Sequence, residues 1–159
     1  MGVIMGFISE SGTGFAAPIK GLVALLLAPL MIGAVPTGTL DLSIDGLRSQ
    51  RGDVQLCMTM LPAKFPSCKG DPDARRMTVP APQAAQLRIE NLPQGQYAIA
   101  VIHDENSNAK LDTALGIPRE GFGFSRNPVI MFGPPRFSAA EFGVGDGESA
   151  QRLKMKYLL

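Results

Sequence analysis

The chain has 159 residues, of which 45% are hydrophobic and 18% are charged, which suits one globular domain with its own core. Its formal net charge of +1 provides no strongly basic or acidic surface, and we therefore expect no nucleic acid among its partners. No internal repeat is visible.

The first expected element is an export signal. Residues 21–34 form an uncharged apolar run, and Lys20 in front of it is the only basic residue before Arg48. A transmembrane helix needs about 20 residues, whereas this shorter run has the length of a signal-peptide core that ends in small residues. We expect residues 1–34 to be removed and residues 35–159 to form a single periplasmic or secreted domain without a stable membrane span. A buried core helix is the alternative interpretation of the run.

The first two strands are predicted by strict alternation of apolar and polar residues, the pattern of half-buried strands. Residues 40–45 alternate in this way, and residues 54–60 do so again. The turn between them contains glycine, so we expect the two strands to form a hairpin.

The chain has two cysteines, Cys57 and Cys68, with ten residues between them. In an exported protein an even pair at short range usually bridges, so we expect a Cys57–Cys68 disulfide. Two free thiols in a cytosolic protein are the alternative. The proline-rich residues 61–82 show little periodicity, and we expect them to form a loop that this bridge holds in place.

A central strand is predicted further along the chain. Residues 87–92 resume the alternation, and after a turn at 93–95 residues 97–102 are almost wholly apolar, as in a strand packed on both faces. A long glycine-rich segment covers residues 104–135, and lysines alternate along a last strand over residues 153–157. Six or seven short strands with frequent turns predict an all-β fold, an antiparallel β-sandwich. The side chains expected in its core are Leu40, Leu42, Ile44, Val54, Leu56, Leu87, Ile89, Tyr97, Ile99 and Val101.

Oxygen-bearing side chains recur at alternate positions directly after the central strand, so that one tight loop can aim several oxygens at a point. Ala109 stands at the sixth position of this stretch, where calcium loops have glycine, and Leu115 stands at the twelfth in place of glutamate. Two interpretations stay open: a weak Ca²⁺ site, the only cofactor expected, or a turn whose Asx side chains cap their own backbone. The candidate ligands are Asp104, Asn106, Asn108, Lys110 (through its carbonyl) and Asp112.

Aromatic residues gather in the long segment and just beyond it. The phenylalanines at positions 122, 124, 132 and 137 are expected to form a flap that seals one end of the sandwich, and a ligand site is the alternative. Arg119, Arg126 and Arg136 flank them, where they either contact an anionic or sugar ligand or keep the flap solvated.

Two classes of function stay open. The first is an exported, non-catalytic module with a binding or structural role, which meets a ligand or protein through residues 104–135. The second is a small extracytoplasmic hydrolase or ligand-processing enzyme that uses His103 with nearby carboxylates. The enzyme requires His103 to lie in a cleft, with Asp104, Glu105 or Glu120 within hydrogen-bond reach.

The residues from 92 onward resemble known exported proteins. Residues 92–99 read L-P-Q-G-Q-Y-A-I, similar to a strand start in prealbumin-like and collagen-adhesin B-type sandwiches, whose tyrosine caps the core. The order of the segments 92–112, 115–125 and 132–137 is similar to a bacterial family of exported proteins of unknown function, domain-of-unknown-function family 2141. The resemblance implies a small exported Ig-like or prealbumin-like sandwich and no particular chemistry. That family's loop usually reads D-E-N-G-N-G-K-L-D, and this chain has Ser107 and Ala109 at the two glycine positions.

Overall fold

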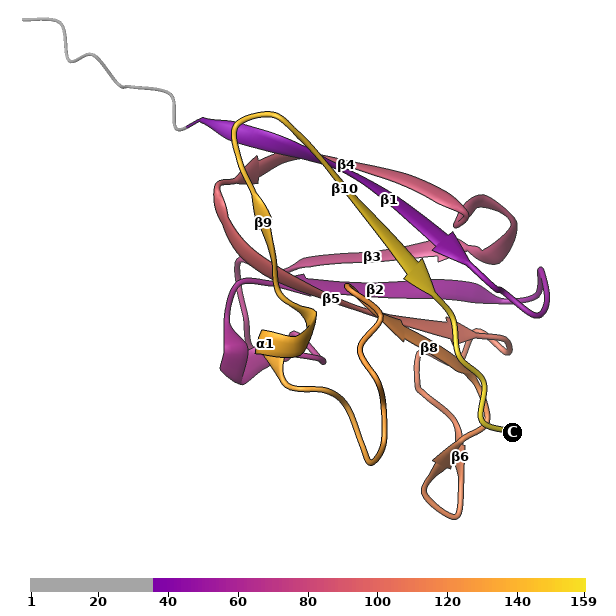
Figure 1. The fold of residues 1–159 in the computed structure, drawn as a ribbon. Coiled ribbons are helices and arrows are strands. Elements are labelled where there is room, and N and C mark those ends of the chain that lie inside the picture. Colours follow the sequence, from indigo (N-terminus) through magenta and orange to yellow (C-terminus); the bar gives the residue numbers. More distant parts are fainter. Residues whose placement is uncertain (1–35) are drawn as a thin grey trace, which may run out of the picture. The chain divides into compact units, whose positions relative to one another are not determined.

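The structure, a computed structural model, describes residues 36–159 (Figure 1). The predicted signal peptide over residues 1–34, and the expected start of the mature chain at Val35, lie outside the described residues. Within the described residues, no helix is long and apolar enough to cross a membrane.

The first of two facing sheets has the strand order β10–β1–β4 (Figure 1). β1 lies in the middle, antiparallel to β4 and parallel to β10. Leu40 lies opposite Ile89, and Ile44 lies opposite Leu153, so that apolar side chains line up across the sheet on one face. The strands are β1 Thr37–Asp45, β4 Gln86–Pro93 and β10 Glu148–Lys154.

The second sheet has the order β3–β2–β5–β8, and β9 pairs with the beginning of β5. A small hairpin, β6–β7, extends from the segment between β5 and β8. The one α-helix of the described residues, α1, is a single short turn before β9. The bounds are β2 Asp53–Thr59, β3 Arg75–Pro80, β5 Gly95–Asp104, β6 Thr113–Ala114, β7 Ile117–Pro118, β8 Gly121–Phe124, α1 Phe137–Ala140 and β9 Phe142–Val144, with 3-10 turns at Pro62–Lys64 and Ala81–Gln83.

The predicted β-sandwich is confirmed, whereas the predicted hairpin between residues 40–45 and 54–60 is wrong. β1 and β2 belong to different sheets, because the chain between them crosses from one layer to the other. Alternation identifies a strand and its buried face, but it does not identify the neighbour of that strand. The end of the predicted loop over residues 61–82 also differs, since it forms β3 at the edge of the second sheet.

The Cys57–Cys68 disulfide is confirmed, with the two Cα atoms 5.8 Å apart. It joins β2 to the loop that follows it. The buried Asp71 holds the far end of the same loop, because its carboxylate accepts a hydrogen bond from the Thr59 hydroxyl. That hydrogen bond lowers the pKa of Asp71 below its usual value.

The main core lies between the two sheets. Nine of the ten predicted core residues are buried, and Leu87 is half-buried on the edge strand β4. Tyr97 is among the buried residues, and its hydroxyl donates to the carbonyl oxygen of Pro93 at 2.8 Å, across the turn that precedes β5. Each large apolar side chain that is fully buried contributes about 1.5–3 kcal/mol to folding.

A second apolar cluster covers the outer face of β5, which confirms that this strand is packed on both faces. Phe65, from the loop that the disulfide holds, packs edge-on against Phe124 with 5.8 Å between the ring centroids. Three of the four phenylalanines predicted to lie together do so, but they cover the outer face of β5 and do not form the predicted flap over one end of the sandwich. The fourth, Phe132, is 95% exposed. The buried members of the cluster are Ala98, Ala100, Phe122, Phe124, Phe137 and Ala140.

Candidate functional site

The loop after β5 is organised around the carboxylate of Asp104, which is completely buried. One of its oxygens accepts the backbone N–H of Asn108 at 3.0 Å. The other accepts the backbone N–H of Ala109 at 2.6 Å and the side-chain amide of Gln55 at 2.7 Å. Both carboxylate oxygens are therefore used by N–H donors.

Asp112 closes the other side of the same loop. Its carboxylate accepts the side-chain amides of Asn106 at 2.8 Å and Asn108 at 3.1 Å. The backbone N–H of Lys110 donates to the side-chain oxygen of Asn108 at 2.9 Å. All five residues predicted for this loop are thus brought together, in a compact turn capped by its own side chains.

The geometry favours the capped turn over the calcium site. The oxygens of Asp104, Asn106 and Asn108 accept backbone N–H bonds from within the loop, which is the pattern of Asx side chains that cap their own backbone. Among the described residues, no group of three or more His, Cys, Asp or Glu side chains is placed to hold a metal ion. Calcium binding is the alternative interpretation of this loop, and melting with and without Ca²⁺ decides between the two.

Glu120 ties the loop to the sandwich, a role that the sequence did not reveal. It is buried, and its two carboxylate oxygens accept the backbone N–H of Glu105 at 3.1 Å and of Asp112 at 2.9 Å. Because these N–H groups lie at the two ends of the loop, one carboxylate holds both ends.

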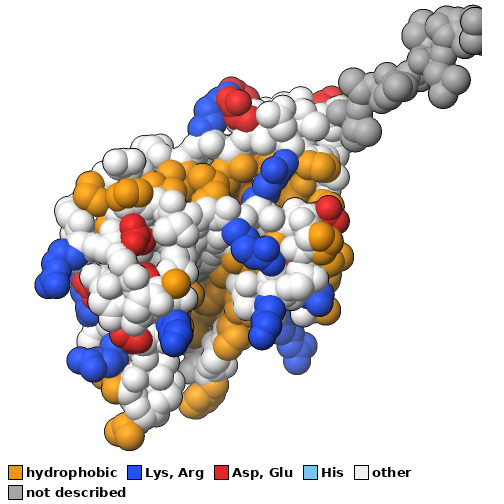
Figure 2. Space-filling view, turned by 180° about the vertical axis from the view of Figure 1, so that it is seen from behind, with side chains coloured by type: hydrophobic (Ala, Val, Ile, Leu, Met, Phe, Trp, Pro, Cys, Tyr) orange, Lys and Arg blue, Asp and Glu red, His pale blue; other side chains and the backbone are white. Residues whose placement is uncertain are grey.

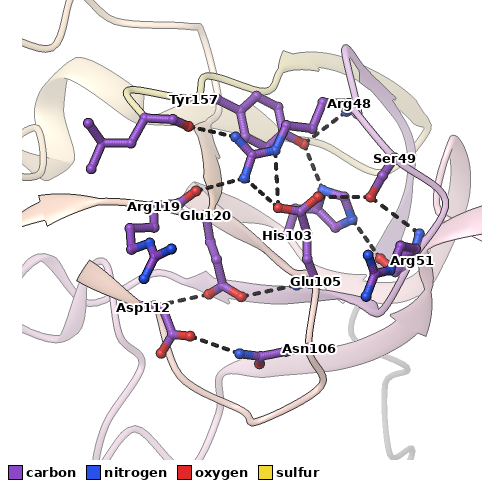
Figure 3. A network of polar contacts seen from close by, with 11 residues as sticks. Arg48, Ser49, Arg51, His103, Glu105, Asn106, Asp112, Arg119, Glu120 and Tyr157 are labelled. Atoms are coloured by element: carbon purple, nitrogen blue, oxygen red, sulfur yellow. Dashed lines mark hydrogen bonds and ion pairs between the residues drawn. The ribbon is translucent and has the colours of Figure 1, made fainter. Parts of the chain in front are cut away.

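His103 is completely buried, and both ring nitrogens have partners (Figure 3). Nε2 lies 2.9 Å from the carbonyl oxygen of Arg51, and Nδ1 lies 2.7 Å from the hydroxyl oxygen of Tyr157. A carbonyl oxygen only accepts, so we assign the proton to Nε2 and let the tyrosine hydroxyl donate to Nδ1. The same hydroxyl oxygen accepts the backbone N–H of Arg48 at 3.1 Å, which leaves no polar atom of the group unpaired.

Arg48 connects this histidine to the loop and to the C-terminus (Figure 3). Its guanidinium donates to the Glu105 carboxylate at 2.5 and 3.0 Å, to the carbonyl oxygen of Leu159 at 2.6 Å and to that of Arg119 at 2.8 Å. It also lies 4.5 Å from the centre of the Tyr157 ring. The hydrogen bond from Arg48 is the main reason why the pKa of Glu105 lies below its usual value.

No pattern in the sequence pointed to Arg48 or Tyr157, because their partners are 54 to 111 residues away along the chain. Among the described residues, no carboxylate hydrogen-bonds to His103, and His103 does not line either of two surface hollows there. One, of about 290 Å³, is lined in part by Met60 and Arg75, and the other, of about 430 Å³, by Phe65 and Arg136.

The most unusual surface lies on the segment between β5 and α1. Val129, Met131 and Phe132 are 86%, 80% and 95% exposed, and Leu115, in the turn of the β6–β7 hairpin, is fully exposed. Figure 2 shows hydrophobic side chains at the protruding tips along its lower edge, with Lys and Arg side chains above them. Soluble domains rarely leave several large apolar side chains so fully in water without a binding purpose.

A family model described as an uncharacterized protein conserved in bacteria, DUF2141, matches residues 42–152. The chain therefore belongs to this family, as its resemblance indicated. No curated protein and no solved structure matches the chain. Because membership assigns no chemistry, the function has to be argued from the surface and the polar network.

Proposed function

We propose that the chain is an exported, non-catalytic binding module whose recognition surface is carried by residues 104–135. The observation that carries this proposal is that Leu115, Val129, Met131 and Phe132 are at least 80% exposed, whereas the other exposed large apolar side chains of the described residues are 39–56% exposed. A sandwich of two packed sheets is a rigid base from which loops present such side chains.

Export is supported by the apolar leader and by the Cys57–Cys68 disulfide, which is typical of oxidising compartments. N-terminal sequencing of the protein recovered from outside the cytoplasm is expected to begin at or near Val35. Exported material that still begins at Met1 would contradict cleavage of the leader.

The enzyme alternative finds no support in the geometry. A general base has to reach a substrate proton, whereas His103 is 0% exposed and has both ring nitrogens in hydrogen bonds. The carboxylates nearest to it along the chain are also engaged: Asp104 caps the loop, and Glu105 binds Arg48.

Site-specific photocrosslinking in cells tests the binding proposal. Phe132→benzoylphenylalanine should form discrete adducts, and Leu115→benzoylphenylalanine should form the same adducts. The matched control is Leu61→benzoylphenylalanine. It places the same group on an exposed leucine two residues after the last residue of β2, outside the proposed recognition surface. Adducts of equal yield at all three positions, or at none of them, would overturn the proposal.

A further inference from the structure

The loop over residues 126–136 is firmly held at its base. The side chain of Asn127 donates to the carbonyl oxygen of Arg152 and accepts the backbone N–H of Lys154, both at 2.7 Å. The ammonium of Lys156 donates to the carbonyl oxygen of Pro128 at 2.9 Å. These bonds fasten the loop to β10 and to the chain that follows it.

The tip of the loop, in contrast, presents its side chains to solvent. Ile130 packs inward against the second apolar cluster, while Val129, Met131 and Phe132 point away and are almost fully exposed. A flexible apolar segment would collapse onto the protein surface, but here the anchored base and the inward Ile130 hold the other three side chains out. The tip is therefore arranged in advance for a partner.

The β6–β7 hairpin offers a second apolar tip. Leu115 is fully exposed there and has a φ of 53°, a left-handed conformation that leucine rarely adopts and that turns usually give to glycine, asparagine or aspartate. Neither packing nor backbone preference accounts for a leucine at this position. In Figure 1 the hairpin, labelled β6, and the orange 126–136 loop both extend toward the lower edge.

The charged residues within the two tips are all basic, while the carboxylates that flank the hairpin are buried (Glu120) or bonded inside the capped loop (Asp112). Residues 113–119 and 126–136 together contain three arginines and no acidic residue. Among the described residues, Arg119, Arg126 and Arg136 take part in no ion pair, unlike Arg48, Arg88 and Arg152. Lys156 adds a fourth cation at the base of the loop.

We propose that these two tips insert into the surface of an anionic phospholipid bilayer while the surrounding cations contact its headgroups. This inference rests on the proposed binding function and names the partner. The tips are convex and separate, so a protein partner would need two matching pockets, whereas a fluid bilayer accepts both without any. Peripheral binding of this kind combines buried apolar side chains with attraction between basic residues and anionic lipids.

Co-sedimentation of the purified protein with vesicles tests the inference. The protein should sediment with phosphatidylglycerol vesicles and stay in solution with phosphatidylcholine vesicles. Phe132→Ser and Leu115→Ser should each lower the partition coefficient by about tenfold, because each removes one apolar side chain from the bilayer. Arg126→Gln should weaken binding to the anionic vesicles, and added salt should do the same.

Two matched controls separate the tips from general surface effects. Leu61→Ser removes an exposed leucine outside residues 113–119 and 126–136, and Arg75→Gln removes an exposed arginine on β3. Both should sediment like the wild type. The tip variants should also keep the wild-type melting temperature, since the replaced side chains contribute little to the core.

The inference is overturned if the wild type does not sediment with phosphatidylglycerol vesicles, or if the tip variants sediment as well as it does. Protein-sized adducts at position 132 in the crosslinking experiment, together with no vesicle binding, would overturn the lipid partner while supporting a binding module. Discrete adducts of lipid mass at positions 115 and 132, and none at position 61, would support both.

Discussion

Single residues in the 104–112 loop hold backbone conformations that suit glycine better. Ser107 and Ala109 have φ values of 56° and 62°, in the left-handed region. Neither side chain has the freedom of glycine at positive φ, so both residues hold a backbone conformation that suits them less well. A non-glycine residue there costs on the order of 1 kcal/mol.

Ala109→Gly should therefore stabilise the domain. The relief of backbone strain exceeds the extra chain entropy of glycine, and we expect a gain of roughly 0.5–1 kcal/mol, since the N–H bond to Asp104 is retained. Urea denaturation measures the change. The matched control is Ala139→Gly in α1, an exposed helical alanine whose replacement should destabilise instead. A loss of stability in Ala109→Gly would contradict the claim that the left-handed backbone of Ala109 is strained.

The second prediction for a single residue concerns the hydroxyl of Tyr157. Tyr157→Phe removes the hydroxyl that pairs with the His103 ring and with the Arg48 N–H, and leaves a fully buried ring nitrogen without a partner. We expect a loss of about 1–3 kcal/mol in the free energy of unfolding. Tyr97→Phe, which removes one hydroxyl that bonds only to a backbone carbonyl in the structure, should cost less. Equal losses would argue against the network.

At the scale of elements, β5 organises the molecule. Its inner face contributes Ile99 and Val101 to the main core, its outer face lies under the second cluster, and its last residues lead into the capped loop. The loop and the C-terminal segment then meet through Arg48 and Glu105. A change in the charge of Glu105 therefore affects the contacts of the capped loop, of Arg48 and of the C-terminal segment.

The stability of this junction should depend on pH. The pKa of Glu105 in the folded protein lies below its ordinary value of 4.5, mainly because of the hydrogen bond from Arg48. Its contribution is thus fully present above about pH 4.5 and is lost as the pH falls through the lower, folded-state pKa. In Glu105→Gln, the melting temperature should therefore fall less steeply below about pH 4.5 than it does in the wild type. Asp146→Asn, which removes an exposed carboxylate between β9 and β10, should leave the acid dependence of the melting temperature unchanged.

The capped loop makes a prediction about calcium. A site with a Kd of about 10⁻⁴ M would add about 1.4 kcal/mol at roughly 1 mM Ca²⁺, or about 3–5 °C in melting temperature. Because N–H donors already occupy the oxygens of Asp104, we expect equal melting temperatures with chelator and with millimolar Ca²⁺. A rise of that size which Asp104→Ala abolishes would establish the calcium site instead.

At the scale of the whole molecule, the disulfide supports the second cluster from outside the sheets. It holds the loop that carries Phe65, whose ring packs on Phe124 and Phe137. Reduction, or the double replacement Cys57→Ala with Cys68→Ala, should cost about 3 kcal/mol in the chain-entropy model for a loop of this length. Intact-mass analysis after alkylation without reductant should show no labelled cysteine. Two labelled cysteines would contradict the bridge.

The sequence alone determined the class of fold and most of the core. Period-two alternation is a local property, and a strand with one buried face has to bury the residues of that face, whichever strand lies beside it. The disulfide was predictable because the leader predicts export, and an even pair of cysteines at short range usually bridges in an oxidising compartment. The capped turn was predictable as one of two outcomes, because Asx side chains bond to backbone groups near them.

Only the tertiary structure decided which strands are neighbours and which polar residues meet. The parallel pairing of β1 with β10, and the contacts of Arg48 with Glu105 and Leu159, join residues that lie far apart along the chain. It also separated Phe132 from the other phenylalanines, because the anchored loop turns Ile130 inward and leaves Phe132 in water. The residue type does not determine whether a phenylalanine is buried or exposed. The path of the backbone decides where its side chain lies.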